Sequence, residues 1–342
     1  MFVDLSTPLL LVLFAAAALC ILAGGVKMTG QADVIADRTG LGEALIGGVL
    51  LGAATSLSGT IVSLTSALDG RASLAFSNGI GGIAAQTAFL ALADILHRKV
   101  NLEHAAADLV NVFQGALLMF MLAIPLAAWL GPDVAILGIH PASFLLLAIY
   151  IMGIYASGQV RNDPMWTAVD TEETAPDEPD EEADEFPSTP RLAAAFGGLM
   201  LVMGGAGWVI AGTAGVLTDR LEMSASVVGA LVTAVVTSLP ELVTTLAAVR
   251  RGALQLAVGG IIGGNIFDTL FLVLGDAGYR AGSIYHAISK DDVFWLAVGL
   301  MMTAILTLGQ LYRQRQGPAN IGLESMGILA TYGAAIAIQT LL

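Results

Sequence analysis

The residues best suited to chemistry in this chain are two carboxylic acids that lie inside long apolar runs. Glu241 follows Pro240 in the motif TSLPELVTT, and Asp268 lies in the next run, in GGIIGGNIFDTLF. A charged group at such a position is unfavourable by about 2.5 kcal/mol or more unless it faces a cation, a partner or water. The proline also lacks a backbone N–H and opposes the carbonyl four residues earlier, which predicts a kink that frees backbone oxygens. Together these features indicate a site for a hard cation, which prefers oxygen ligands.

The spacing of the two acids favours one shared site. If the chain reverses at Gly252, both acids lie near the middle of their helices, because each residue advances a helix by about 1.5 Å. Three neighbouring side chains would add neutral oxygens, namely Thr237, Ser238 and Asn265. The alternative is that Glu241 is protonated or paired with an arginine and only stabilises the helices, while the glycines only permit close packing.

The composition determines which elements must hold these residues. The 342 residues are 56% hydrophobic and 12% charged, and the mean hydropathy is +0.80, which is typical of a multi-pass membrane protein. A spanning helix needs about 20 apolar residues, so the length suits an all-α protein of ten spans. Apolar runs separated by polar breaks place these spans at 7–26, 41–68, 72–96, 109–130, 133–158, 191–216, 224–249, 253–278, 291–312 and 320–341.

One long polar segment divides the chain. Residues 160–190 are rich in Asp, Glu and Pro, and they carry most of the net charge of −14. Such a composition predicts a disordered, self-repelling linker between a first unit at 1–159 and a second at 191–342. The chain shows no basic surface for nucleic acid, so we expect the lipid bilayer and inorganic cations as its partners.

The positions of the basic residues predict the orientation, because lysine and arginine accumulate in cytoplasmic loops. Of the fourteen, ten lie on the side of the membrane that carries the 160–190 linker, and four lie on the side of the termini. We therefore expect a cytoplasmic linker and outward termini in the inner membrane of a prokaryotic cell. The oligomeric state stays open.

An internal repeat connects the two units. Residues 25–94 align without a gap on residues 207–276, and the identities include polar and glycine positions such as Thr55-Ser56-Leu57 on Thr237-Ser238-Leu239. Five spans separate equivalent points, and an odd number means that the second unit runs inverted through the membrane. In the first unit Gly59 stands where the second has Glu241, and Gln86 stands where it has Asp268, so that unit offers neutral oxygens only.

Four further acids lie near span ends. The repeat pairs Asp94 with Asp276, and we interpret both as capping or interfacial residues first and as ion-coupling residues second. Glu43 and Asp69 are interpreted as interfacial.

Two inverted repeats, each with a TSL break followed one span later by a glycine-rich stretch, resemble the alpha repeats of the calcium/cation antiporter superfamily, the sodium/calcium exchanger membrane region. The second repeat carries the fuller motifs, TSLPE and GGNIFD. The resemblance implies a fold of ten helices as five plus five, with a central cation site. Carried over position by position, it implies as ligands Thr237, Ser238, Glu241 and Asp268 from the second repeat and Thr55, Ser56 and Gln86 from the first.

The sequence departs from the family pattern inside that site. Gly59 replaces one of two glutamates, and Gln86 replaces an Asn or Asp. Further replacements are Gly82 and Gly264 for serines and Gly260 for an asparagine. Loss of one central carboxylate lowers the charge available to balance a divalent ion.

These observations predict a secondary active cation antiporter that works by alternating access and exchanges Ca²⁺ or another cation for Na⁺ or H⁺. The alternatives are a monovalent cation/proton exchanger and an uncoupled, channel-like or vestigial relative. An enzyme is not expected, because the four histidines all lie at breaks and no H-E-x-x-H or Ser-His pair falls within a span. No cofactor is expected beyond the transported cations.

Overall fold

The computed structural model describes residues 2–39, 55–97, 100–174 and 189–341. Over these ranges the chain is helical and contains no β-strand. The elements in chain order are η1 (Phe2–Asp4), α1 (Thr7–Thr39), α4 (Leu57–Leu68), α5 (Ala72–His97), α6 (Leu102–Ala105), α7 (Leu109–Leu130), α8 (Pro141–Asn162), α9 (Thr189–Arg220), α10 (Ala225–Val227), η4 (Val228–Thr233), α11 (Ala234–Thr237), α12 (Leu239–Arg251), α13 (Leu254–Asp268), α14 (Leu270–Gly278), α15 (Ile284–Ala287), α16 (Lys290–Tyr312), η5 (Pro318–Asn320) and α17 (Leu323–Leu341).

Long apolar helices make this an integral, multi-pass membrane protein. Within the described ranges seven helical stretches are long and apolar enough to cross a membrane, and eight if the bent pair from Ala225 to Arg251 forms one span. The 12-residue α4 and the 19-residue α17 are not among them. The span predicted over 41–68 is described only from residue 55 onward, and Glu43 lies outside the described residues.

Several helix boundaries differ from the prediction. The long helices α1 and α9 continue beyond the predicted ends at 26 and 216, to Thr39 and Arg220. Helix α8 begins at Pro141 instead of residue 133, because the apolar residues before it form a tight turn. That turn has positive φ at Leu137 and Gly138, which a helix does not allow.

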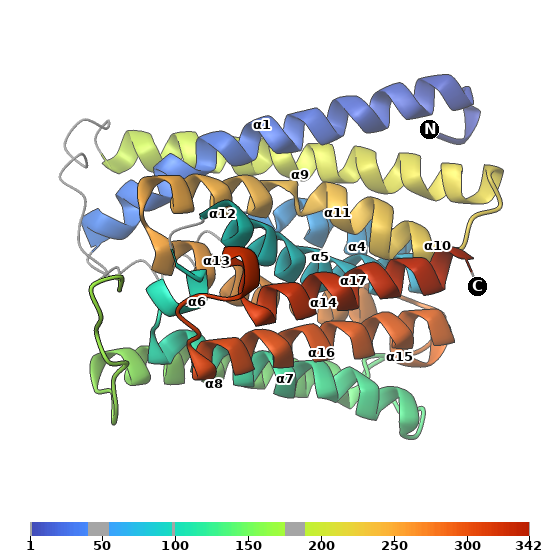
Figure 1. The fold of residues 1–342 in the computed structure, drawn as a ribbon. Helices are drawn as coiled ribbons and strands as arrows, with labels where there is room; N and C mark the ends of the chain where they lie inside the picture. Colours follow the sequence, from blue (N-terminus) through green and yellow to red (C-terminus); the bar gives the residue numbers. More distant parts are fainter. Residues whose placement is uncertain (1, 40–54, 98–99, 175–188, 342) are drawn as a thin grey trace.

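The arrangement places two helical segments at the centre. Helix α5 and the α13–α14 pair are buried along most of their length, and α5 contacts α4, α12, α13, α16 and α17. The long α1 and α9 pack side by side along one edge of the molecule (Figure 1). Both termini lie at one end of the bundle, and the end of α8 and the start of α9 lie at the opposite end (Figure 1).

Helix breaks occur at the same point of the two repeats. The helical segment from Ala225 to Arg251 is bent by 43° between Thr237 and Leu239, which confirms the kink predicted beside Pro240. In the first repeat α4 begins directly after Ser56, whose φ and ψ of −74° and −1° resemble the −94° and 5° of Ser238. The chain reverses after α12 at Gly252, where φ is 87°, as expected.

The paired acids Asp94 and Asp276 fix short connections to the spanning helices. Each carboxylate accepts hydrogen bonds from two backbone N–H groups, and the two sets of donors are related by the same offset of 182 residues that relates the repeats. The donors are Leu102 and Gly322 for Asp94, at 2.7 and 3.1 Å, and Ile284 and His140 for Asp276, at 3.0 and 2.7 Å. These contacts agree with capping roles. Asp69 is the C-terminal cap residue of α4.

Candidate cation site

Two close helix crossings bring the broken segments together. A Cβ placed on Gly25 of α1 would lie 2.7 Å from Pro240 Cα, and one on Gly207 of α9 would lie 2.9 Å from Ser58 Cα. These two crossings are equivalent under the repeat, because Gly25 aligns with Gly207 and Ser58 with Pro240. A glycine at each crossing lets the backbone that carries the TSL motif approach to a distance that any side chain would prevent.

Glu241 lies at the start of α12, beside the opposite repeat. Its side chain is 3% exposed, and Oε1 accepts a hydrogen bond of 3.2 Å from the Ser56 hydroxyl. The Thr55 hydroxyl is a second donor to this carboxyl group. Residues that are 185 positions apart in the chain thus form one polar contact.

Asp268 forms the second half of the same site. Gln86 Nε2 donates to Asp268 Oδ2 at 2.6 Å and to the Ser238 hydroxyl at 3.2 Å. Gln86 and Asp268 are equivalent positions of the two repeats, so this bond lies where the repeats meet. Ser56 also reaches Asp268, and the two carboxyl groups are close enough to repel each other when both are ionised.

These side chains surround a small, closely packed cavity, whose empty space of about 160 Å³ has no room for a water molecule. Its lining combines hydroxyl, amide and carboxyl groups with a single aromatic ring, and comprises Ser56, Gly59, Asn78, Gly82, Gln86, Thr237, Ser238, Glu241, Asp268 and Phe271. Six of the eight predicted site residues belong to this lining, and Thr55 contacts Glu241 from just outside it.

Asn265 is the predicted residue that the structure does not bring to the cavity. It is fully buried, and its Nδ2 donates at 3.1 Å to the Thr87 hydroxyl on α5. Asn265 and Asp268 are three residues apart on α13. They contact the adjacent residues Thr87 and Gln86 of α5, respectively. Asn265 Oδ1 is buried without a hydrogen-bond partner, but Asn265 is not part of the cavity lining, so its ligand role stays a prediction.

Four oxygen atoms of the lining residues are buried without a hydrogen-bond partner. They are Glu241 Oε2, Asp268 Oδ1, Gln86 Oε1 and Asn78 Oδ1. A buried acceptor without a donor is unfavourable by about 1–3 kcal/mol, and more if it is charged. A set made only of unsatisfied acceptors matches a cation or protons and would repel an anion.

The sequence reasoning did not identify Phe271, which occupies the place of the missing glutamate. A Cβ on Gly59 would lie 2.7 Å from Phe271 Cε2 and 3.5 Å from the Thr237 hydroxyl. Phe271 is three residues after Asp268, so helical spacing could have placed both on one face. The sequence offers Asn78 as one of the neutral oxygens of the first repeat, but the ligand set that the family resemblance implies does not include it. Its Nδ2 donates to the Gly59 carbonyl and to Ser63, which leaves its oxygen in the cavity lining.

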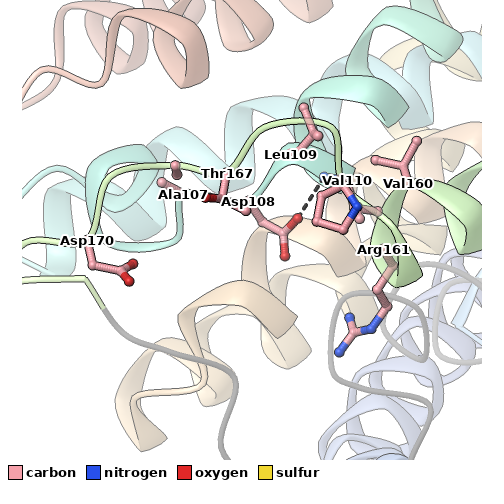
Figure 2. A pocket seen from close by; sticks show the side chains of 10 residues that line it. Ala107, Asp108, Leu109, Val110, Val160, Arg161, Thr167 and Asp170 are labelled. Atoms are coloured by element: carbon pink, nitrogen blue, oxygen red, sulfur yellow. Dashed lines mark hydrogen bonds between the residues drawn. The ribbon is translucent and has the colours of Figure 1, made fainter.

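A larger pocket, with about 730 Å³ of empty space, lies away from these residues. It is formed by the start of α7, the end of α8 and the segment that follows α8 (Figure 2). Of its two acids, Asp108 accepts a 2.7 Å hydrogen bond from the Val110 N–H and so caps α7, as the dashed line in Figure 2 shows. We interpret this pocket as a surface feature of the helix ends.

Comparison with known proteins agrees with this arrangement. The sodium/calcium exchanger protein family matches residues 9–158 and 191–341. The chain is 28% identical to the inner membrane protein YrbG of Escherichia coli over 90% of its length and 89% of that protein. It is 26% identical to the putative antiporter CaxA of Alkalimonas amylolytica, covering 82% of this chain and 85% of CaxA.

Solved structures show the same fold. The chain superposes on the sodium-calcium exchanger NCX_Mj soaked with 2.5 mM Na⁺ and 0.1 mM Ca²⁺, with a TM-score of 0.62 and 20% identity over 98% of this chain and 99% of that one. For NCX_Mj soaked with 10 mM Na⁺ and 10 mM Sr²⁺ the TM-score is 0.64, at 19% identity over 98% and 100%. From the family match over both units, the chain belongs to the sodium/calcium exchanger protein family.

Proposed function

We propose that this protein is a secondary active cation antiporter that works by alternating access, with Glu241 and Asp268 as its ionisable core. The observation that carries the proposal is the cavity whose lining has four unpartnered oxygens and two carboxyl groups, one from α12 and one from the end of α13. Membership of an exchanger family supports cation antiport in general. The chemistry needs no cofactor and no covalent step, so we assign no catalytic residue.

The architecture that we propose for this function is ten membrane helices as two inverted units, 1–159 and 191–342, joined by the acidic segment 160–190. The equivalent contacts of Asp94 and Asp276, together with the two equivalent glycine crossings, support a two-fold relation in the membrane plane. By the distribution of basic residues, the linker is cytoplasmic and the termini face outward, in the inner membrane of a prokaryotic cell.

The transported cation is Ca²⁺ or another cation, exchanged for Na⁺ or H⁺. Proton exchange is favoured by the arrangement of the acids, because two buried carboxyl groups that repel each other cannot both stay charged without a cation. When the cation leaves, a proton takes its place, and this links the two fluxes. The second candidate is a monovalent cation/proton exchanger, which the Phe271 ring in place of a second glutamate favours.

Coupled flux in proteoliposomes tests the proposal. Vesicles that contain a pH-sensitive dye are exposed to Ca²⁺, Na⁺ or K⁺ gradients. Three proteins are compared: the wild type, Glu241→Gln and Glu222→Gln. Glu222→Gln is the control, because the Glu222 side chain is exposed beyond the end of α9. We expect a cation-driven pH change with the wild type and the control, and none with Glu241→Gln. Coupled transport at the wild-type rate in Glu241→Gln would overturn the proposal, and cation flux without any proton or Na⁺ movement would indicate a channel.

A further inference from the structure

A second group of acids lies outside the lining of the central cavity. Asp94 at the end of α5, Glu103 of α6 and Glu324 at the start of α17 are 1%, 1% and 6% exposed. One carboxylate oxygen from each lies within 4.8 Å of the other two. The three residues come from separate elements, so the fold itself, and not local sequence, concentrates this charge.

The charge of this cluster has no counter-charge among the described residues. The ion pairs among the described residues join other groups. Neither Glu103 oxygen nor Glu324 Oε1 accepts a hydrogen bond from a donor group, although the Glu103 and Glu324 carboxyl groups are close enough to share a proton. The neighbouring Arg313 donates to the backbone carbonyls of His104 and Val169. Burial, followed by the charges of Asp94 and Glu324, raises the pKa of Glu103 well above its usual range.

A neutral side chain completes the ring of unsatisfied groups. Asn101 is 1% exposed, and neither its Oδ1 nor its Nδ2 has a hydrogen-bond partner. A Cβ on Gly322 would contact Glu324 Oε1 and would lie 3.2 Å from Asn101 Nδ2, so the amide borders the acids. Because amide N and O are assigned from their partners, rotation of this amide offers an oxygen to the cluster.

The equivalent connection in the second repeat provides an internal comparison. There Asp276 occupies the position equivalent to Asp94, and its Oδ2 accepts a hydrogen bond of 2.7 Å from the Ser143 hydroxyl. That hydroxyl in turn contacts the Tyr285 phenol at 2.9 Å. By the repeat offset, Tyr285 is the equivalent of Glu103, and an alanine is the equivalent of Glu324. Capping therefore needs only the aspartate, and the two glutamates have no role in it.

We infer that Asp94, Glu103, Glu324 and Asn101 form a second cation site, which takes a hard divalent ion of the size of Ca²⁺. The three carboxylate oxygens lie within 4.8 Å of one another, which is close enough for all three to bind one ion at the distance of about 2.3–2.6 Å that Ca²⁺ prefers. Ca²⁺ also accepts an irregular set of oxygen ligands from separate elements, whereas Mg²⁺ needs a regular octahedron. An ion here would neutralise buried carboxylates and tie α6 to the ends of α5 and α17.

Equilibrium dialysis with Ca²⁺ on the purified full-length protein in detergent separates this site from the central one. In the variant Glu241→Gln/Asp268→Asn the central carboxyl groups are absent, and we expect the protein still to bind one Ca²⁺ per chain, with weaker Mg²⁺ binding. Adding Glu103→Gln should weaken this remaining binding at least about tenfold, whereas adding Glu222→Gln should leave it unchanged.

Two results would overturn the inference. One is a central double variant that elutes as a monodisperse protein and binds no Ca²⁺, which would mean that the cluster holds protons only. The other is residual binding that Glu103→Gln does not weaken. If Glu103→Gln does not fold, the central double variant alone still shows whether the cluster binds Ca²⁺. Glu103→Asp then replaces Glu103→Gln in the test of whether Glu103 contributes to that binding. The two proposals can fail separately. If the wild-type protein shows no coupled transport but the central double variant still binds Ca²⁺, the antiport proposal fails and the second cation site stands.

Discussion

At the scale of single residues, the central cavity is asymmetric although the repeats that build it are equivalent. Glu241 and Asp268 supply both carboxyl groups from the second repeat, and the equivalent positions Gly59 and Gln86 supply none. Phe271 fills the space beside Gly59. The space that a glutamate at position 59 would need is therefore occupied, and a single substitution of Gly59 cannot restore the acid.

Restoring the glutamate needs two changes. Gly59→Glu alone would clash with the Phe271 ring, since even its Cβ would lie 2.7 Å from Cε2. In Gly59→Glu/Phe271→Ala the third carboxyl group has room beside Thr237, and we expect Ca²⁺ affinity at least about tenfold higher, or about 1.4 kcal/mol. Calcium titration calorimetry would measure the change. Phe271→Ala alone is the control, and equal affinity of the double variant and this control would contradict the assignment.

The residues near Asp268 show what spacing can and cannot predict. Asn265 and Phe271 both lie three residues from Asp268, and the sequence treats these positions alike. The structure directs Asn265 to Thr87 and Phe271 into the cavity lining. Periodicity assigns a side chain to a helix face, but which neighbour that face meets depends on helix crossings that only the folded chain defines.

At the scale of elements, the site depends on two helix breaks held by glycine crossings. The break beside Pro240 was predictable, because proline cannot continue a helix ladder. The break at Ser56 has no proline, and only the repeat with Ser238 pointed to it. The start of α8 was not predictable from hydropathy, because the turn before it is itself apolar.

The glycine crossing of α9 gives a matched test of this account. In Gly207→Ala the new Cβ would lie 2.5 Å from the Ser58 carbonyl oxygen, so the backbone must move, at about 1–3 kcal/mol. We expect a lower thermal unfolding temperature in detergent and weaker cation binding. In the control Gly205→Ala, on the same helix, the Cβ meets nothing within 4 Å, and stability should be equal or slightly higher. Equal stability of the two variants would be incompatible with a tight crossing.

At the scale of the whole molecule, the two repeats share one backbone arrangement, or frame, but carry different polar and charged side chains. The offset of 182 residues, found in the sequence, recurs in the Gln86–Asp268 bond and in the donors to Asp94 and Asp276. The sequence could therefore predict the frame. It could not predict the second acid cluster, because Glu103 and Glu324 lie outside the aligned repeat segments and meet only through the folding of α6 and α17 against α5.

The central claim is that a cation and protons compete for the Glu241–Asp268 pair. Proton release on cation binding tests it most directly, measured with a pH dye in weakly buffered detergent solution near neutral pH. A Glu103→Gln background removes the contribution of the second cluster. We predict that added Ca²⁺ releases protons in proportion to the cation bound, and that Asp268→Asn abolishes the release. Cation binding without proton release, or release that Asp268→Asn leaves undiminished, would contradict the account.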